Sequence, residues 1–239
     1  MLSKSDFLNK LDQIFINENL LEKEKNYIKN IKENEDQLPN QITADVLIAR
    51  LGLITIKGIT DEDGYFKEFI NTIDKDEIES QTEIFYLLKG KQVSCWHSLK
   101  VTETWNWLGG KEISLFIVTG QEIKEVLLNE TNSSFTIAER TLFGAKITNP
   151  TDNNNFGWVT CLCKPGFERE KYINPTSKEI GNLTQTYPER NALIHELTPK
   201  TSDNNKTKRS IFQYFRSFCC NNGEQNNEQT PLINRHNKI

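Results

Sequence analysis

The residues of this chain that are best suited to chemistry lie in one short stretch, from Cys95 to Gly110. On an extended chain, side chains two positions apart point to the same face. One face of this stretch therefore carries a histidine, a glutamate and two tryptophans among apolar side chains: His97, Leu99, Val101, Glu103, Trp105 and Trp107. An imidazole and a carboxylate within an apolar wall are typical of a pocket lining, and we predict a pocket here.

His97 and Glu103 would serve such a pocket as a general acid and base. A carboxyl group beside aromatic rings can have a raised pKa, and an imidazole titrates near neutral pH. Trp105, Tyr86 and Tyr65 would offer a surface on which a sugar or base ring stacks. The alternative is that the acid–base pair is simply hydrogen-bonded in a dry interior and that the aromatic residues are core packing.

We expect no metal and no other cofactor in this pocket. Of the three histidines, only His97 lies in the strand-rich part of the sequence, while His195 falls on a predicted helix and His236 in the tail. Three protein ligands are the usual minimum for a retained zinc, iron or manganese ion. None of the five cysteines has the C-x-x-C spacing of a zinc site.

The elements that must position this stretch are mostly strands. Short segments rich in β-branched and aromatic residues, most of them followed by Gly, Asn or Asp turns, fill the middle of the chain. Their predicted ranges are 83–88, 93–97, 102–108, 112–118, 122–127, 134–137, 144–147 and 156–164. Because no helices alternate with these strands, the pattern predicts an antiparallel sandwich or barrel.

The chain divides into three predicted parts. Residues 1–40 show helical periodicity and predict a helical extension, which packs on the main domain or binds a partner. Residues 41–198 form the main domain, with a short helix at 42–51 and another at 189–197. Residues 199–239, rich in Asn, Gln, Lys and Thr, are predicted to be largely disordered.

One segment of the tail, residues 206–220, is both basic and aromatic and ends in Cys219 and Cys220. Such a segment can lie in the interface of an anionic membrane, and neighbouring cysteines are candidate S-acylation sites. The alternative is a helix that docks on the main domain or on a dimer partner. Because S-acylation needs a transferase, a bacterial source would imply delivery into a eukaryotic host cell, as an effector.

Composition excludes several classes of protein. The net charge of -4 over 239 residues lacks the basic footprint of a nucleic-acid-binding protein, so we expect no nucleic-acid partner. Residues 1–9 contain no apolar core of a signal peptide, and the apolar stretch 113–118 is too short to span a bilayer. An odd number of cysteines indicates a reducing compartment, for which we expect the cytoplasm.

A series of short motifs follows in order along the chain. They are Leu51-Gly52-Leu53, Glu62-Asp63-Gly64-Tyr65-Phe66, the set His97, Glu103 and Trp105, then Pro165-Gly166-Phe167 and Tyr187-Pro188. In this order they resemble the cupin-five family, an uncharacterised branch of the cupin superfamily, over residues 41–198. The resemblance implies a mainly β fold, the double-stranded β-helix of the cupin or jelly-roll barrel, with N-terminal helices and a C-terminal helix. It also implies a homodimer that pairs through edge strands.

The chain departs from the family pattern at two places. Asn106 stands where the family usually has a histidine, and residues 137–142 lack the proline, turn glycine and tryptophan of the second cupin motif. We therefore expect a degenerate pocket for a sugar- or nucleotide-like small molecule, with weak or no catalysis. One alternative is a metal-independent sugar or nucleotide-sugar isomerase or epimerase that uses His97 or Glu103 as its base. Another is a membrane-tethered interaction protein with the cupin as its scaffold.

Overall fold

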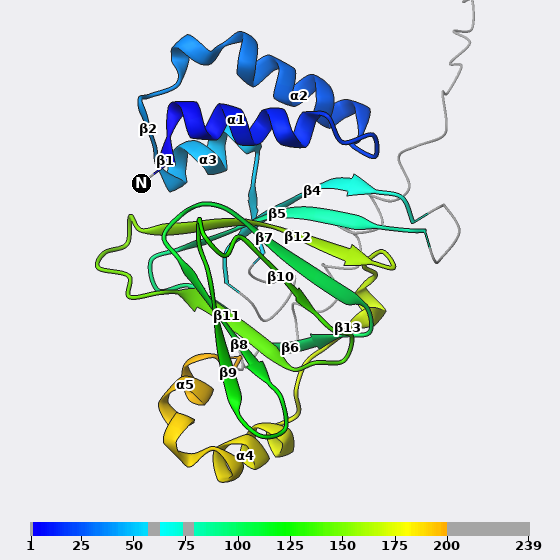
Figure 1. Cartoon of the computed structure of the whole chain (residues 1–239), viewed down its shortest axis with the longest axis vertical. Helices are drawn as coiled ribbons and strands as arrows, with labels where there is room; N and C mark the ends of the chain where they lie inside the picture. The colour runs from blue at the N-terminus through cyan, green and yellow to red at the C-terminus, as the bar shows by residue number, and fades with distance from the viewer. Residues whose placement is uncertain (1, 57–62, 74–78, 200–239) are drawn as a thin grey trace, which may run out of the picture. The chain divides into compact units, whose positions relative to one another are not determined.

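The computed structural model describes residues 2–56, 63–73 and 79–199 (Figure 1). Residues 200–239, with Cys219, Cys220 and the segment 206–220, lie outside the described residues. Contacts along the chain group Met1–Thr201 into one compact unit, which includes the helices of residues 1–40. Among the described helices, none is both long and apolar enough to cross a membrane.

Two antiparallel sheets form the centre of this unit. The six-stranded sheet has the order β10-β7-β12-β5-β4-β3, and the five-stranded sheet has the order β13-β6-β11-β8-β9. The strands of the first sheet are β3 (Ile54–Thr55), β4 (Tyr65–Asn71), β5 (Thr82–Lys89), β7 (Thr102–Gly110), β10 (Ser134–Ile137) and β12 (Phe156–Lys164). Those of the second are β6 (Val93–Leu99), β8 (Ile113–Val118), β9 (Ile123–Leu128), β11 (Phe143–Ile147) and β13 (Tyr172–Ile173).

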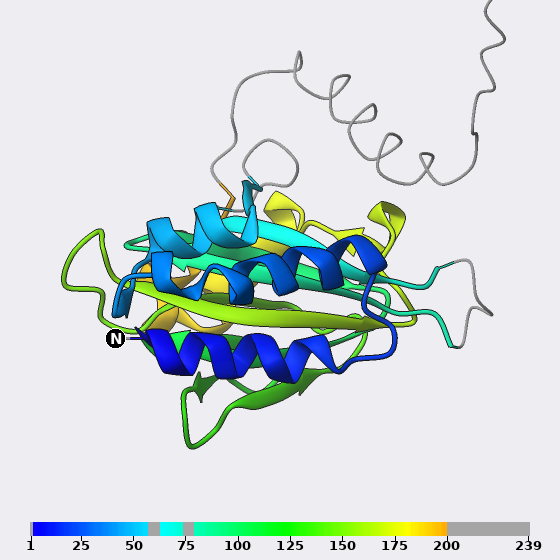
Figure 2. The same cartoon turned by 90° about the horizontal axis from the view of Figure 1, so that it is seen from above.

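Helices cover the outer faces of both sheets. The helices on the six-stranded sheet are α1 (Lys4–Phe15), α2 (Glu22–Glu33) and α3 (Ala44–Leu51), with the 3₁₀ turn η1 (Glu35–Gln37) and the small pair β1 (Leu2–Ser3) and β2 (Gln41–Ile42). On the five-stranded sheet lie α4 (Ser177–Thr186) and α5 (Asn191–Glu196), with η2 (Arg169–Lys171) and η3 (Pro188–Arg190). Figures 1 and 2 show α1 and α2 side by side over the first sheet, and Figure 1 shows α4 and α5 under the second.

The alternation of β5 shows how one strand serves two cores. Phe85 and Leu87 belong to the apolar cluster between the sheet and α1–α3, whereas Tyr86 and Leu88 belong to the cluster between the two sheets. Successive side chains of a strand point to opposite faces, so a strand that is covered on both sides is apolar at nearly every position. The interior of the sandwich is therefore built from every second residue of each strand.

The helices begin and end where local chemistry dictates. Thr43 caps α3 by accepting a hydrogen bond from the backbone N–H of Val46, and Gly52 ends it in the left-handed conformation (φ 65°). The N-cap of α1 is Ser3, whose side chain accepts a hydrogen bond from the backbone N–H of Asp6. Helix α4 was not predicted, although Thr176 and Glu179 form the capping box that begins it.

Candidate functional site

His97 and Glu103 reach the interior of the sandwich from opposite sheets. His97 lies on β6 of the five-stranded sheet and Glu103 on β7 of the six-stranded sheet, so the chain between them crosses from one sheet to the other. The prediction that one extended face carries both residues is therefore wrong. The tertiary structure nevertheless turns both side chains inward. Phe143 of β11 contacts the His97 ring at 4.2 Å between centroids and the Trp105 ring at 6.3 Å. Glu103 is buried and lies two positions before Trp105 on β7, so it shares the inward face of that strand.

A β-bulge in β6 turns His97 inward. Ser94 pairs with Ala145 and His97 pairs with Phe143, so two residues of β6 stand opposite the single residue Gly144. Without this extra residue, positions 94 and 97 would face opposite sides, because strand side chains alternate. Gly144 leaves room for the bulge, since a Cβ there would lie 3.0 Å from the Ser94 carbonyl oxygen.

Neighbouring groups hold the buried His97 ring in one orientation. Its Nδ1 donates to the carbonyl oxygen of Cys95 at 2.8 Å, which in the neutral ring places the lone pair on Nε2. The Tyr172 ring stacks on it with centroids 4.9 Å apart and an interplanar angle of 13°. With only 4% of its surface exposed, the His97 ring is fixed in this orientation.

Glu103 places a carboxylate in the same interior, 8% exposed. In the sheet, Glu103 is paired with Cys163 on the neighbouring strand β12 and with Ile137 on the neighbouring strand β10. Burial and the Glu103 charge raise the pKa of the Cys163 thiol well above its ordinary value, against a smaller opposite effect of Lys171. Cys163 is therefore a neutral thiol at physiological pH, neither a thiolate nucleophile nor a ready thiolate ligand.

Trp105 and Tyr86 form the aromatic part of this interior. Their rings meet edge to face, with centroids 5.6 Å apart, and the Tyr86 hydroxyl donates to the Asp63 carbonyl oxygen at 2.6 Å. The Trp105 indole N–H is buried and has no acceptor among the described residues. A buried donor without an acceptor costs about 1–3 kcal/mol, so a water molecule or a ligand oxygen would be favoured at this place.

Tyr65 does not join the other four predicted pocket residues. It packs, half-buried, against the cluster between the six-stranded sheet and the helices, whereas the neighbouring Phe66 contacts the interior cluster. The register of β4 decides this, because a shift by one residue exchanges the two faces of a strand. Sequence alone did not fix that register, since Tyr65 and Phe66 suit either face equally well.

The described residues do not offer the ligand set of a metal site. In residues 2–56, 63–73 and 79–199, no group of three His, Cys, Asp or Glu side chains could hold an ion together. His195 is exposed on α5, while His236 lies outside the described residues.

Asn106 lies on the outer face of β7. Glu103, Trp105 and Trp107, which alternate with it along the strand, face inward. Its side chain donates to the Thr160 hydroxyl at 3.2 Å and accepts from the Ser134 hydroxyl at 2.8 Å. Asparagine at this position therefore leaves the interior around His97 unchanged.

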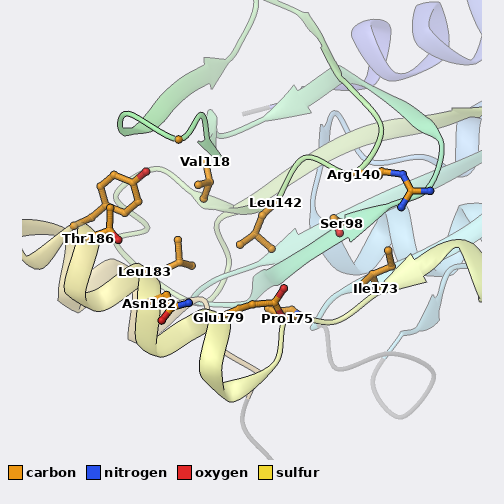
Figure 3. Close-up of a pocket in the computed structure, with 12 residues that line it drawn as sticks. Ser98, Val118, Arg140, Leu142, Ile173, Pro175, Glu179, Asn182, Leu183 and Thr186 are labelled. Atoms are coloured by element: carbon orange, nitrogen blue, oxygen red, sulfur yellow. The ribbon is translucent and has the colours of Figure 1, made fainter.

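The described cavity drawn in Figure 3 lies elsewhere. It has a volume of about 390 Å³ and lies between α4 and the outer face of the five-stranded sheet. Its lining includes Ser98 and Arg140 but none of the five predicted pocket residues. The sequence did not indicate this cavity, because α4, which forms one wall, was not predicted.

Comparison with known proteins adds a family and a fold. A model of the cupin-five family, described as Cupin superfamily (DUF985), matches residues 45–173. A hypothetical protein from Leishmania major has 22% identity and a TM-score of 0.54, over 66% of this chain and 100% of its own. A protein from Shewanella oneidensis has 21% identity and a TM-score of 0.56, over 67% of this chain and 100% of its own. A search of curated proteins found no match.

Proposed function

The chain belongs to the DUF985 family of the cupin superfamily, with the double-stranded β-helix fold, and from this premise we propose that it binds a small organic molecule inside the β-sandwich. The observation that carries the proposal is the buried Trp105 indole N–H, which has no acceptor among the described residues. It faces the same interior as His97 and Glu103. An interior that contains a spare donor together with an imidazole and a carboxylate suits a polar ligand better than dry packing does.

The chemistry of the three side chains indicates the ligand class. Trp105 would donate to a ligand oxygen, and the His97 imidazole and the Glu103 carboxylate make the surroundings of that oxygen polar. The Tyr86 and Tyr172 rings add apolar surface on which a ring can pack. A ring that carries several hydroxyl groups, as in a sugar- or nucleotide-like molecule, matches this set.

We propose that catalysis in this interior is weak or absent. Cys163 is kept neutral, which leaves only His97 and Glu103 as acid–base groups. One observation favours the alternative of a metal-independent sugar or nucleotide-sugar isomerase. The hydrogen bond from His97 Nδ1 to the Cys95 carbonyl presents Nε2 as a base of fixed direction. The predictions of a homodimer, of membrane association through residues 206–220 and of delivery into a host cell stay predictions.

The test is a thermal-shift screen with sugars and nucleotide-sugars on four proteins: the wild type, Trp105→Phe, His97→Ala and Trp158→Phe. Trp158 is the matched control, because its indole N–H is also buried without an acceptor among the described residues, but it packs between the sheet and the helices. A ligand at 100 times its Kd stabilises the folded state by about 2.7 kcal/mol. We expect that shift in the wild type and Trp158→Phe and a much smaller one in Trp105→Phe and His97→Ala.

Two outcomes would contradict the proposal. One is a ligand whose thermal shift is the same in all four proteins, because the interior would then play no part in binding. The other is a screen in which no sugar or nucleotide-sugar stabilises the wild type. Turnover of a bound sugar by the wild type but not by His97→Ala would favour the isomerase instead.

A further inference from the structure

The cavity beside α4 has the composition of a binding site. Its volume of about 390 Å³ lies within the range of small-molecule pockets. Figure 3 shows an apolar middle, formed by Val118, Leu142 and Leu183, with Arg140 beside Ser98 at one end. Among the described lining residues Arg140 is the single cation, and an apolar middle with a cation at one end is complementary to a ligand with an apolar body and an anionic group.

A strained turn places the backbone of the exposed Arg140 at this end of the cavity. Its φ of 59° lies in the left-handed region, which side chains other than glycine rarely adopt. Its backbone N–H donates to the Leu99 carbonyl oxygen at 2.6 Å, which ties the turn to β6. Backbone strain of this kind lowers the stability of the fold, and it occurs most often at functional sites, where it places a side chain for its role.

Glu179 restricts the charge of the ligand. It lies on the α4 wall, where its carboxylate accepts hydrogen bonds from the backbone N–H and the hydroxyl of Thr176, both at 2.7 Å. These bonds lower the pKa of Glu179, so the group is an anion at neutral pH. The Glu179 carboxylate would repel a phosphate dianion bound in the cavity. It would repel a monocarboxylate bound at Arg140 less, because that ligand carries only one negative charge.

We propose that this cavity binds an organic monocarboxylate with an apolar chain or ring. The Arg140 guanidinium would bind the carboxylate through two parallel N–H···O hydrogen bonds, with Ser98 beside it as a further donor. Val118, Leu142 and Leu183 would cover the apolar body. The site is separate from the sandwich interior, because Ser98 lines this cavity while the preceding residue, His97, faces the opposite side of β6.

The test is calorimetric titration of the full chain with octanoate and 3-phenylpropanoate, each beside its neutral amide. We expect saturable one-to-one binding of at least one carboxylate. Its amide should bind about tenfold or more weakly, because it lacks the charge that pairs with Arg140. Absence of saturable binding by both carboxylates would overturn the proposal, and so would equal affinities for acid and amide.

Arg140→Gly separates loss of binding from loss of folding. Glycine adopts the left-handed conformation without strain, so the Tm should rise by about 2–4 °C while carboxylate affinity falls about tenfold or more. Arg140→Gln should lose the affinity without the gain in Tm. The matched control is Arg190→Gln, which removes an exposed arginine outside the cavity and should bind as the wild type does.

A second pair of variants separates this site from the sandwich interior. Leu142→Trp fills the cavity and should abolish carboxylate binding, whereas His97→Ala should leave it unchanged. Binding that is lost in His97→Ala but kept in Arg140→Gly would place the carboxylate in the interior and overturn this proposal. A failure of the sugar screen with carboxylate binding intact would overturn the interior site alone.

Discussion

His97 and Ser98 are neighbours on β6, but they face two different environments. His97 points into an interior made of aromatic rings and strand residues, and both sheets surround it. Ser98 lines a cavity between the same sheet and a helix, with Arg140 and Glu179 on its walls. The interior is enclosed by the strand pairing of two sheets, whereas the cavity depends on how one helix lies over the sheet. Substitutions should therefore cost more stability in the interior than around the cavity.

The sharpest test of this comparison uses two consecutive residues, Phe143 and Leu142. Phe143 is fully buried in the interior and contacts both His97 and Trp105, while Leu142 is half-buried in the cavity wall. We expect Phe143→Ala to lower the free energy of unfolding by about 3–5 kcal/mol, because it removes a large buried ring. Leu142→Ala should cost about 1 kcal/mol, because water already reaches that side chain. Urea unfolding measures both, and equal losses would contradict the comparison.

The second prediction concerns the pH dependence of the interior. The pKa of Cys163 is raised in the folded state, so the native protein keeps this proton after the unfolded chain has lost it. The contribution of Cys163 to stability is therefore complete below the unfolded thiol pKa of about 8.5 and is lost as the pH rises through the folded pKa. Between pH 8.5 and the folded value, we expect up to about 1.4 kcal/mol of lost stability per pH unit.

Urea unfolding at several alkaline pH values, compared between the wild type and Cys163→Ala, isolates this effect. Cys163→Ala should lack the extra loss above pH 8.5. Glu103→Gln should reduce the loss, because removing the carboxylate charge lowers the folded pKa of the thiol. An unchanged slope in Cys163→Ala would show that this thiol does not remain protonated in the folded interior.

The smallest expected effect lies on the helix wall of the cavity. Thr176 caps α4 by accepting from the backbone N–H of Glu179, and Glu179 accepts in return from the backbone N–H of Thr176. Thr176→Ala should cost about 1 kcal/mol of unfolding free energy, the usual value for a lost N-cap. If the cavity depends on α4, the same variant should also weaken carboxylate binding. Full stability with weakened binding, or the reverse, would show that helix stability and the cavity are not coupled.

Much of the strand content was predictable because its signal is local. The predicted ranges 134–137 and 156–164 coincide with β10 and β12, and 83–88 lies within β5. Alternation and turn residues can be read within a few positions, without knowledge of the partner strand. Helix α4 carries an equally local signal, the capping box of Thr176 and Glu179.

The arrangement of the candidate site was less predictable, since it depends on contacts far apart in the sequence. Nothing near His97 shows that β6 and β7 belong to different sheets, because that depends on pairing with β11 and β12. The bulge opposite Gly144 is also set by the partner strand. The side of β4 on which Tyr65 lies follows from its register with β5.

The sequence by itself determined the mainly β fold and the presence of one histidine and one glutamate near each other in the chain. It also carried the ordered motifs by which the cupin family can be identified. Only the tertiary structure decided that these two side chains enter one interior from opposite sheets, that Tyr65 faces the helices, and that Arg140 stands at the end of a cavity. Local patterns are encoded residue by residue, whereas a site between sheets or under a helix exists only once distant segments have packed together.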